Sequence, residues 1–341
     1  MAVKVTLRDV AAAAGVAEST ASRALAGSGQ LSADTRQRII DAAAQLGYET
    51  GGKLAAQALD APRRRGVIGV VVAALNNSFY PYLVDRLHND LDDLGFDMVL
   101  IIDEITRDRA GRKLRTLIDT LDGVIVTTAM IGSPMVDFLV DRGVPTVLAI
   151  RSNMQNTAHV VESDNIAAGA EALAHLVSLA HRRIGLLMGP ANTSTTVGRL
   201  QGARMVLERS GLTVDDDLVF HTEFTHEGGY SGCVQLMRAA KPPSALFCAN
   251  DVIAIGALDA ARKMGIDVPA ALSIIGVDDI PMASWSMISL TTVRQPIGEI
   301  GAMAAKLVSE AVAQGTVLEP KSHIFPTNLL VRATTGPAKT G

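Results

Sequence analysis

The chain has little of the chemistry from which catalytic and metal sites are usually built. It holds only two cysteines, Cys233 and Cys248, each among apolar neighbours, and one tryptophan among its 341 residues. Cysteines in such surroundings predict buried thiols in a reducing compartment and argue against a metal site. The sequence also lacks a Gly-x-Gly-x-x-Gly fingerprint, a phosphate-binding loop, a Gly-x-Ser-x-Gly elbow and a histidine cluster at ligand spacing. We therefore expect a protein that is not an enzyme and carries no cofactor.

Charged residues make up only 19% of the chain, yet no stretch of 18 uncharged apolar residues occurs. The first residues also lack the apolar run of a secretory signal, so we expect no membrane span, no signal peptide and a cytoplasmic protein. The formal charge of −4 is uneven, because residues 1–65 hold nine basic against six acidic residues and the rest holds 22 against 29. A mildly basic head on an acidic body suits contact with nucleic acid at one end, although ordinary charge fluctuation accounts for so small an excess as well.

What is present near the start is a pattern of two short helices hinged at a glycine. Thr6, followed three residues later by Asp9, is a capping-box signal for a helix that starts at Leu7, and Gly15 supplies the left-handed backbone that ends it. A second helix of about eight residues starts near Glu18, and its outward face is small, polar and charged, as reading a DNA groove requires. That face consists of Glu18, Ser19, Ser22 and Arg23. The pattern predicts a DNA-binding helix-turn-helix.

A third helix and a long α/β region follow. An N-cap at Ser32 and a stop at Gly47 bound the helix, and the stretch from there to residue 66 has the composition of a linker with one possible helix, at 54–59. From Val67 on, apolar runs of four to seven residues alternate with helix-length segments, which is typical of parallel strands with crossover helices. The expected strands are 67–73, 98–102, 123–126, 146–150, 184–188, 245–248 and 274–277, and the expected helices are 81–94, 166–179, 199–209, 252–264 and 297–313. Two doubly wound units fit this count better than one.

Polar residues gather where most of the expected strands end. In open α/β sheets ligands bind beyond the carboxyl ends of the strands, so the recurrence favours a cleft for a small polar molecule. The alternative is that each polar residue merely caps the helix that follows it. The clusters are Asn76 to Tyr80, Thr127 with Thr128, Arg151 with Ser152, Asn250 with Asp251, and Asp278 with Asp279.

Over almost its whole length the chain resembles the lactose repressor (LacI/GalR) family of bacterial regulators. Its head is similar to the family signature Thr-Leu-x-Asp-Val-Ala-x-x-Ala-Gly-Val-Ser-x-x-Thr-Val-Ser-Arg. Its body repeats family segments in order, among them Asn77-Ser-Phe-Tyr80, Ala180-His-Arg-Arg-Ile184, Ala249-Asn-Asp251 and Gly276-Val-Asp-Asp-Ile-Pro281. One such segment alone is weak evidence, whereas their order and spacing are specific.

The resemblance implies a small all-α helix-turn-helix headpiece and an α/β core of two doubly wound, Rossmann-like subdomains, as in type I periplasmic binding proteins. The implied domains are a DNA-binding domain at 1–49, a hinge helix and linker at 50–65, and an effector-binding and dimerisation core at 66–341. Within the core, subdomain one would hold 66–161 and 292–321, and subdomain two 162–291 and 322–341, with chain crossings near Glu162, Thr291 and Lys321. A homodimer is implied because one headpiece reads only half of a pseudo-palindromic operator.

The resemblance also implies which headpiece residues read DNA. Glu18 and Ser19 occupy the pair that sets operator preference, and Glu18 is either a specificity residue or a rim residue that faces solvent. Arg23 would pair with a guanine or hold a phosphate, either worth about 1 to 3 kcal/mol. Short polar side chains would grip phosphates, and for Ser32 a plain N-cap is an equally good reading. The expected DNA-binding set is Thr6, Leu7, Ala17, Glu18, Ser19, Thr20, Ser22, Arg23, Gln30, Ser32, Thr35, Tyr48 and Leu59.

The head departs from the family pattern at three places. Ala17 replaces the usual Ser N-cap of the second helix, and Ala26 replaces the usual Asn that follows it. The hinge has no proline and one extra residue when Leu59 is aligned with the family's minor-groove leucine. In that alignment Leu59 of each subunit would wedge open a central base step of the operator.

In the core, the resemblance implies a cleft that binds a small effector, such as a sugar or sugar derivative. Phe79, Tyr80 and Phe224 would pack on the apolar faces of its ring, although core aromatics are commoner than ligand-stacking ones. Polar side chains would bond its rim, with Arg199 and Asp278 each able to span two hydroxyls. The expected set is Asn77, Phe79, Tyr80, Thr127, Arg151, Arg199, Phe224, Asn250, Asp278 and Gln295.

These features predict a sequence-specific transcriptional regulator, a repressor, that binds double-stranded operator DNA as a homodimer and is switched by the effector. One alternative is the same fold controlled by a protein corepressor or a nucleobase. Trp285, in the loop after Asp278, would then either shape the ligand site or simply pack. A second alternative, a solute-binding protein without a DNA role, would need a signal peptide that the sequence lacks.

Overall fold

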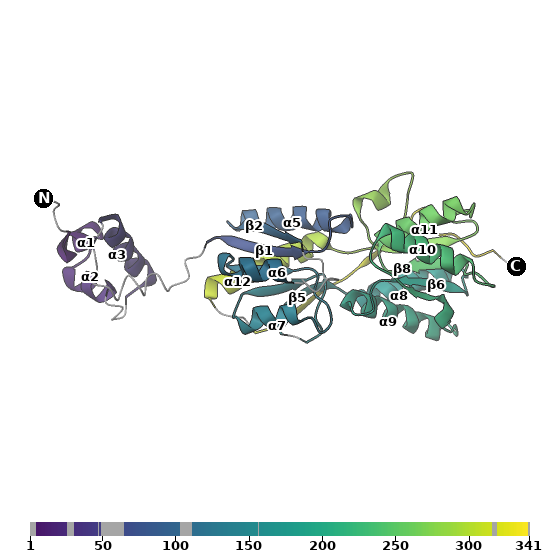
Figure 1. Cartoon of the computed structure of the whole chain (residues 1–341), viewed down its shortest axis with the longest axis horizontal. Helices are drawn as coiled ribbons and strands as arrows, with labels where there is room; N and C mark the ends of the chain where they lie inside the picture. Colours follow the sequence, from purple (N-terminus) through teal and green to yellow (C-terminus); the bar gives the residue numbers. More distant parts are fainter. Residues whose placement is uncertain are drawn as a thin grey trace. The chain divides into compact units, whose positions relative to one another are not determined.

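The computed structural model describes residues 5–25, 31–46, 48, 65–102, 111–155, 157–315 and 319–339. The chain divides into two compact units, 1–64 and 65–341 (Figure 1). The proposed hinge and Leu59, the extra hinge residue, Gln30 and Ala26 lie outside the described residues. Among the helices that are described, none is long and apolar enough to cross a membrane.

The described residues of the first unit form a bundle of three helices, α1 (Leu7–Ala13), α2 (Glu18–Leu25) and α3 (Ala33–Leu46). The capping box is present, because the backbone N–H and the hydroxyl of Thr6 donate to Asp9 Oδ2 at 2.8 and 2.6 Å. Gly15 has a φ of +65°, which ends α1 as the sequence predicted. Val10, Ala21 and Ile39 are fully buried, one from each helix, so the three helices close a single small core.

The second unit contains two sheets. The first is parallel throughout, with strands in the order β11-β5-β4-β3-β1-β2. Its strands are β1 (Val67–Val72), β2 (Asp97–Ile102), β3 (Gly123–Val126), β4 (Thr146–Ala149), β5 (His159–Ser163) and β11 (Ser322–Phe325). Leucines of α5 (Phe79–Asp93) and valines of α12 (Ile297–Gln314) cover one face, while α6 (Arg112–Leu117) and α7 (Pro134–Asp141) cover the other.

The second sheet has the order β12-β10-β9-β8-β6-β7, and only the β10–β12 pair is antiparallel. Its strands are β6 (Ile184–Met188), β7 (Val219–His221), β8 (Ala245–Cys248), β9 (Ser273–Asp278), β10 (Thr291–Arg294) and β12 (Asn328–Leu330). Helices α8 (Asn165–Ser178), α9 (Ser194–Arg209), α10 (His226–Met237) and α11 (Asp251–Lys263) pack on it. Cys233 and Cys248 are buried and form no disulfide, as the sequence predicted.

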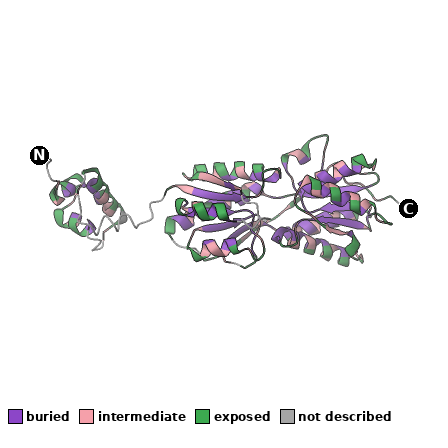
Figure 2. Ribbon diagram, in the orientation of Figure 1, coloured by how far each residue is buried: buried purple, intermediate pink, exposed green. Residues whose placement is uncertain are grey.

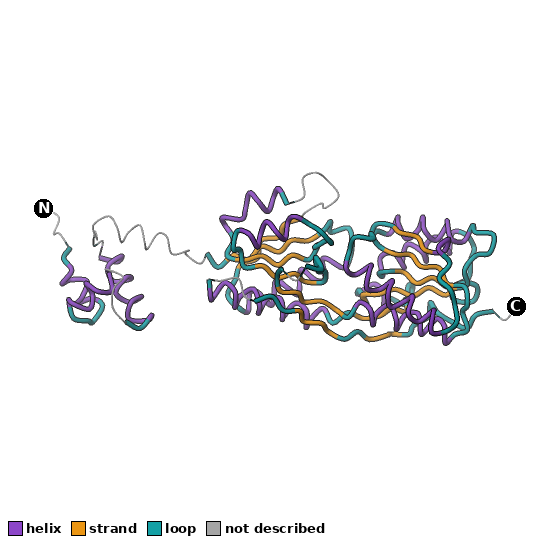
Figure 3. Tube along the Cα trace, turned by 90° about the horizontal axis from the view of Figure 1, so that it is seen from below, coloured by secondary structure: helices purple, strands orange, loops and turns teal. Residues whose placement is uncertain are grey.

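The central strands of both sheets are buried while the outer faces of the helices stay exposed (Figure 2), and the helices run beside the strands (Figure 3). This is the pattern that continuous apolar runs produce when helices cover both faces of a parallel sheet. It confirms the expected fold class, a helical headpiece with two doubly wound α/β subdomains. The strands missed by the sequence reading, β5, β7, β10, β11 and β12, are short or carry polar residues at alternate positions.

Two of the three expected chain crossings lie further along the chain than expected. β10 pairs with β9 in the second sheet, so the chain crosses after Arg294 rather than near Thr291. β11 pairs with β5 in the first sheet, so the last crossing follows Phe325 rather than lying near Lys321. Buried backbone N–H and C=O groups need hydrogen-bond partners. Residues of β10 and β11 find these partners in the neighbouring strand because each strand continues before the chain crosses. The expected boundaries at residues 292 and 322 therefore move to 295 and 326, by three and four residues.

Candidate functional site

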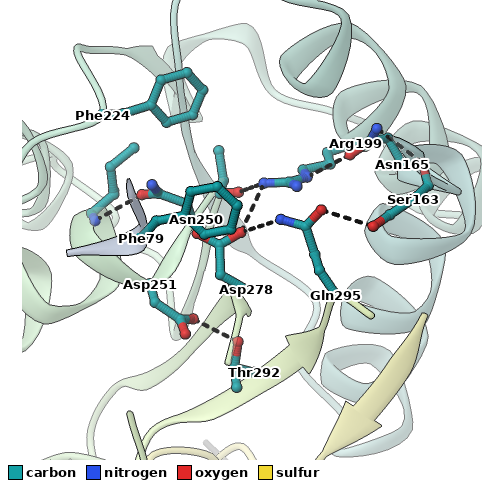
Figure 4. Close-up of polar contacts among 12 residues, drawn as sticks. Phe79, Ser163, Asn165, Arg199, Phe224, Asn250, Asp251, Asp278, Thr292 and Gln295 are labelled. Atoms are coloured by element: carbon teal, nitrogen blue, oxygen red, sulfur yellow. Dashed lines mark hydrogen bonds and ion pairs between the residues drawn. The ribbon is translucent and has the colours of Figure 1, made fainter. Parts of the chain in front are cut away.

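A cavity lies at the carboxyl ends of the strands, between the two sheets of the second unit. Nine of the ten expected effector residues line it, and they come from strand ends, from the loops after them and from helices α5 and α9; several are shown in Figure 4. The lining residues are Asn77, Phe79, Tyr80, Ile150, Arg151, Thr195, Arg199, Phe224, Asn250, Asp278 and Gln295. The polar clusters at strand ends predicted a cleft here, because parallel strands bring their carboxyl ends to one edge, whereas Arg199, Phe224 and Gln295 were expected only from the family resemblance.

Arg199 is the buried cation of the cavity and is 2% exposed. Its Nε donates to Asn165 Oδ1 at 3.0 Å, and its Nη1 donates to the carbonyl of Ala249 at 2.5 Å. Nη1 also lies 3.8 Å from Asp278 Oδ1. Burial lowers the pKa of Arg199, and the carboxylate of Asp278 opposes that shift. The guanidinium is thus fixed in one orientation before any ligand arrives.

Helix packing places Arg199 there. A side chain at Gly169 of α8 would collide with the carbonyl of Arg199, and one at Gly202 of α9 would collide with the carbonyl of Ile166. The two glycines therefore let α8 and α9 touch backbone to backbone. Asn165, the first residue of α8, reaches Arg199 across this contact.

Asp278 is the buried carboxylate that faces Arg199. Gln295 Nε2 donates to Asp278 Oδ1 at 2.6 Å, and Gln295 Oε1 accepts from the hydroxyl of Ser163 at 2.8 Å, which joins the two sheets. Burial raises the pKa of Asp278 to about 6, against the opposing effect of Arg199. Asp278 and Asp279 have φ values of +132° and +56°, and strained backbone of this kind clusters at functional sites.

Asp251 supports this part of the cavity from behind. Its carboxylate is fully buried and accepts from the Thr292 hydroxyl at 2.5 Å and from the backbone N–H of Ile280 at 3.0 Å. Burial, and then the charge of Asp278, raise its pKa well above the ordinary value. Asp251 therefore fixes the loop after β9 and does not line the cavity.

Contacts already join the two halves of the cavity. Asn77 Nδ2 donates to the carbonyl of Phe224 at 3.2 Å, and the Arg151 guanidinium carbon lies 4.8 Å from the centre of the Phe224 ring. Ser152 N donates to Ser194 Oγ at 3.0 Å beside them. The space that remains in the cavity holds about one water molecule. A ligand of ring size enters only when these contacts open.

The aromatic residues divide between core and cavity. Phe79 and Tyr80 are 5% and 2% exposed, belong to the main hydrophobic core and meet edge to face with ring centres 5.7 Å apart. Phe224 is half-buried and lies against Gly189, where any side chain would collide with its ring. All three aromatic residues line the cavity, and Phe79 and Tyr80 belong to the buried core as well.

Thr127 is the expected effector residue that does not line the cavity. Its hydroxyl donates to the carbonyl of Val71 at 2.8 Å, so it holds β1 beside β3. Conversely, the sequence reading missed Ile150 and Thr195. The Thr195 hydroxyl is buried and makes no hydrogen bond within the described residues, so it can bond a ligand. The run of small polar residues four positions before Arg199 was the signal that could have identified it.

In the headpiece, the expected base-reading face is solvent-exposed. Glu18, Ser19, Ser22 and Arg23 of α2 are exposed, and Arg23 Nε folds back on the carbonyl of Ser19 at 3.1 Å. Ser32 acts as an N-cap, since its Oγ accepts from Thr35 N at 3.3 Å. Of the remaining described residues of the expected DNA-binding set, Thr6 and Ala17 are exposed, whereas Leu7, Thr20, Thr35 and Tyr48 are half-buried.

Comparisons with known proteins match the helical headpiece and the α/β core to separate domain families. Residues 6–50 match the bacterial regulatory proteins of the lacI family, and residues 173–335 match a periplasmic binding protein-like domain. The chain is 33% identical to the HTH-type transcriptional regulator MalR of Streptomyces coelicolor over 342 residues, 97% of each chain.

Two solved structures are similar along nearly the whole chain. The transcriptional regulator CelR–cellobiose complex has a TM-score of 0.74 at 30% identity, covering 97% of this chain and 99% of that one. The lac repressor dimer bound to operator and the anti-inducer ONPF has a TM-score of 0.71 at 25% identity, covering 98% and 100%.

Proposed function

The chain belongs to the lacI family of bacterial regulatory proteins, and we propose that it is a repressor that binds a pseudo-palindromic operator as a dimer and responds to a small polyhydroxyl effector. Members of the family are DNA-binding transcriptional regulators, so this chain is a regulator and not an enzyme. We place its action in the cytoplasm, where bacterial operators lie. The proposed domains are a headpiece at 1–49, a hinge at 50–65 and a core at 66–341.

One observation carries the effector proposal, the buried cluster of Arg199, Asp278 and Gln295 at the edge of both sheets. A carboxylate and a guanidinium that already satisfy part of their hydrogen bonds within the protein can each bridge two neighbouring hydroxyls. Phe224 offers an apolar face for the ring. The CelR structure holds cellobiose and another lacI-family structure holds ribose, which supports a sugar as the ligand class.

The switch would act through the contacts that join the two halves. Asn77, Arg151 and Ser152 come from the first subdomain and meet Phe224 or Ser194 of the second. A ligand that enters must replace these contacts with its own, so it biases the angle between the subdomains. A coupling of about 1 to 3 kcal/mol would change operator affinity roughly 5 to 150-fold.

A dimer is supported by a groove on the second subdomain that exposes apolar side chains beside the charged residues Asp259, Arg262 and Asp267. Met287 and Trp285 are 73% and 52% exposed, and Met287 lies in a groove beside Ile255, Leu258 and Ile266. Exposed apolar surface of this kind marks interaction sites. A second copy is its proposed occupant because a pseudo-palindrome requires two headpieces.

Selection from a random DNA pool with the purified full-length protein, with and without a panel of sugars, tests the proposal. We expect a pseudo-palindromic consensus whose affinity changes with at least one sugar. Selection of no consensus would contradict the operator proposal. A consensus unaffected by every sugar, together with no sugar-dependent change in melting temperature, would contradict the effector proposal alone.

A further inference from the structure

Helix α3 reaches the ends of the other two headpiece helices with two arginines. Arg38 Nη2 donates to the carbonyl of Ala14, the residue that ends α1, at 2.7 Å. Arg36 Nη1 donates to the carbonyl of Ala24, near the end of α2, at 3.4 Å. The last carbonyls of a helix have no partner within it, and the negative end of the helix dipole favours a cation there.

The Arg38 bond falls on the turn of the helix-turn-helix. The backbone N–H groups of that turn are already used, since Gly15 N donates to Ala12 O and Val16 N donates to Ala11 O. Gly15 takes the left-handed conformation beside them. The carbonyl of the buried Ala14 is the group through which α3, 24 residues away in the sequence, holds this turn.

We propose that Arg38 is a positioning residue for DNA reading, because it fixes the turn between α1 and α2 and thereby the angle of α2. The face of α2 that carries Glu18 and Arg23 must meet the groove with α1 and α3 in place. Operator affinity scales with the fraction of molecules in which that arrangement is formed. Loss of the bond lowers this fraction.

A direct phosphate contact by Arg38 is the competing role. Its Nη1 lies 4.0 Å from Asp34 Oδ2, in an exposed pair that contributes little to stability. The two roles differ in their dependence on salt. A phosphate contact contributes about one released counterion to the salt slope of binding, whereas a contact within the headpiece contributes none.

The test compares Arg38→Ala, Arg38→Lys and the control Arg8→Ala in the full-length protein. Arg8 is an exposed arginine in the first turn of α1, so the control removes the same charge from the same unit. Binding to a duplex selected from a random pool is measured at several salt concentrations. Hydrogen exchange of the Gly15 and Val16 amides is measured without DNA.

We expect Arg38→Ala to weaken operator binding about tenfold, in keeping with one hydrogen bond to a charged group. In Arg38→Ala the salt slope of binding stays within experimental error of wild type, and the hydrogen-exchange protection of the Gly15 and Val16 amides falls. Arg38→Lys keeps most of the operator affinity and most of the protection. Arg8→Ala leaves the protection unchanged.

Unchanged protection with a salt slope reduced by about one would overturn the proposal in favour of a phosphate contact. Equal loss of protection across α1, α2 and α3 would overturn it in favour of a general role in the headpiece core. If Arg38→Ala does not fold, Arg38→Met, which keeps the aliphatic stem but has no charge and no N–H donor, decides by the same two measurements. A wild-type protein that selects no operator would contradict the operator proposal instead, so the two failures are distinguishable.

Discussion

Arg199 and Asp278 lie 3.8 Å apart and are both almost fully buried, so each charge depends on the other. Removing one partner of such a pair leaves an uncompensated charge and costs about 3 to 5 kcal/mol of stability. Their neighbours Asn165 and Gln295 each use one polar atom on the pair, which fixes both side chains. The side chains of the cavity are therefore held in place for hydroxyl groups before a ligand binds. Substitutions that keep the side-chain shape test how much each group contributes to ligand binding.

Asp278→Asn should weaken effector binding about 10 to 100-fold, because one charge-assisted hydrogen bond is lost, and should also lower the stability of the core, because Arg199 loses its counter-charge. Titration calorimetry with the sugar identified from the panel measures the change. Thr127→Val is the matched control, since Thr127 lies outside the cavity and bonds Val71. An effect of Thr127→Val as large as that of Asp278→Asn would contradict the assignment.

Effector binding should also weaken as the pH falls below about 6. Burial raises the pKa of Asp278 to about 6, so the carboxylate gains a proton at a higher pH than an exposed aspartate does. The protonated group accepts fewer hydroxyl bonds, and affinity falls by at most about tenfold per pH unit. The profile is measured from pH 7.5 to 5. A profile for Asp278→Asn that falls as steeply as that of wild type would rule out Asp278 as the titrating group.

Among the helices and strands, the α8–α9 contact does most to position the site. Gly169 and Gly202 leave no space for a side chain against the backbone of the facing helix. Helix pairs this close interlock rigidly, so a displacement of α8 moves Asn165 and Arg199 together. Helices α10 and α11 touch in the same way, because Gly229 and Gly256 also leave no space for a side chain against the facing backbone.

Gly202→Ala should lower the free energy of unfolding of the core by about 1 to 3 kcal/mol, because the new methyl overpacks the contact with Ile166. It should weaken effector binding as well, since Arg199 lies one turn away. Gly298→Ala of α12 is the control, because nothing lies within 4 Å of the added methyl. It should raise the free energy of unfolding by at most about 0.5 to 1 kcal/mol, because alanine loses less backbone entropy on folding than glycine. Urea unfolding of the full chain compares the two, and equal shifts would contradict the packing argument.

For the whole molecule, operator reading depends on bringing two headpieces together. The groove beside α11 and the exposed Met287 are the proposed contact between two cores. Single headpieces bind half-sites weakly, because half of the phosphate and base contacts are missing. Dimer formation and operator affinity should therefore fall together when the groove is made polar.

Met287→Asp should give a monomer at micromolar concentration and weaken operator binding at least about 100-fold, since it places a charge in an apolar interface. Sedimentation measures the assembly, and a duplex with both half-sites measures the affinity. Ile324→Asp is the control, because it changes an apolar residue of similar exposure, 61%, on the edge strand β11 outside the groove. It should leave the dimer and the operator affinity unchanged. Dimers of Met287→Asp with wild-type affinity would contradict the proposed interface.

The sequence by itself determined the local elements and the neighbourhood of the cavity. The cap formed by Thr6 and Asp9, the stop at Gly15 and the apolar runs of the central strands depend on near neighbours, which periodicity reveals. Only the tertiary structure decided that Thr127 turns to Val71, that Thr195 is buried in the cavity and that β10 and β11 continue before crossing. Those outcomes depend on partners distant in the chain, and spacing along one chain does not encode which distant groups satisfy a buried polar atom.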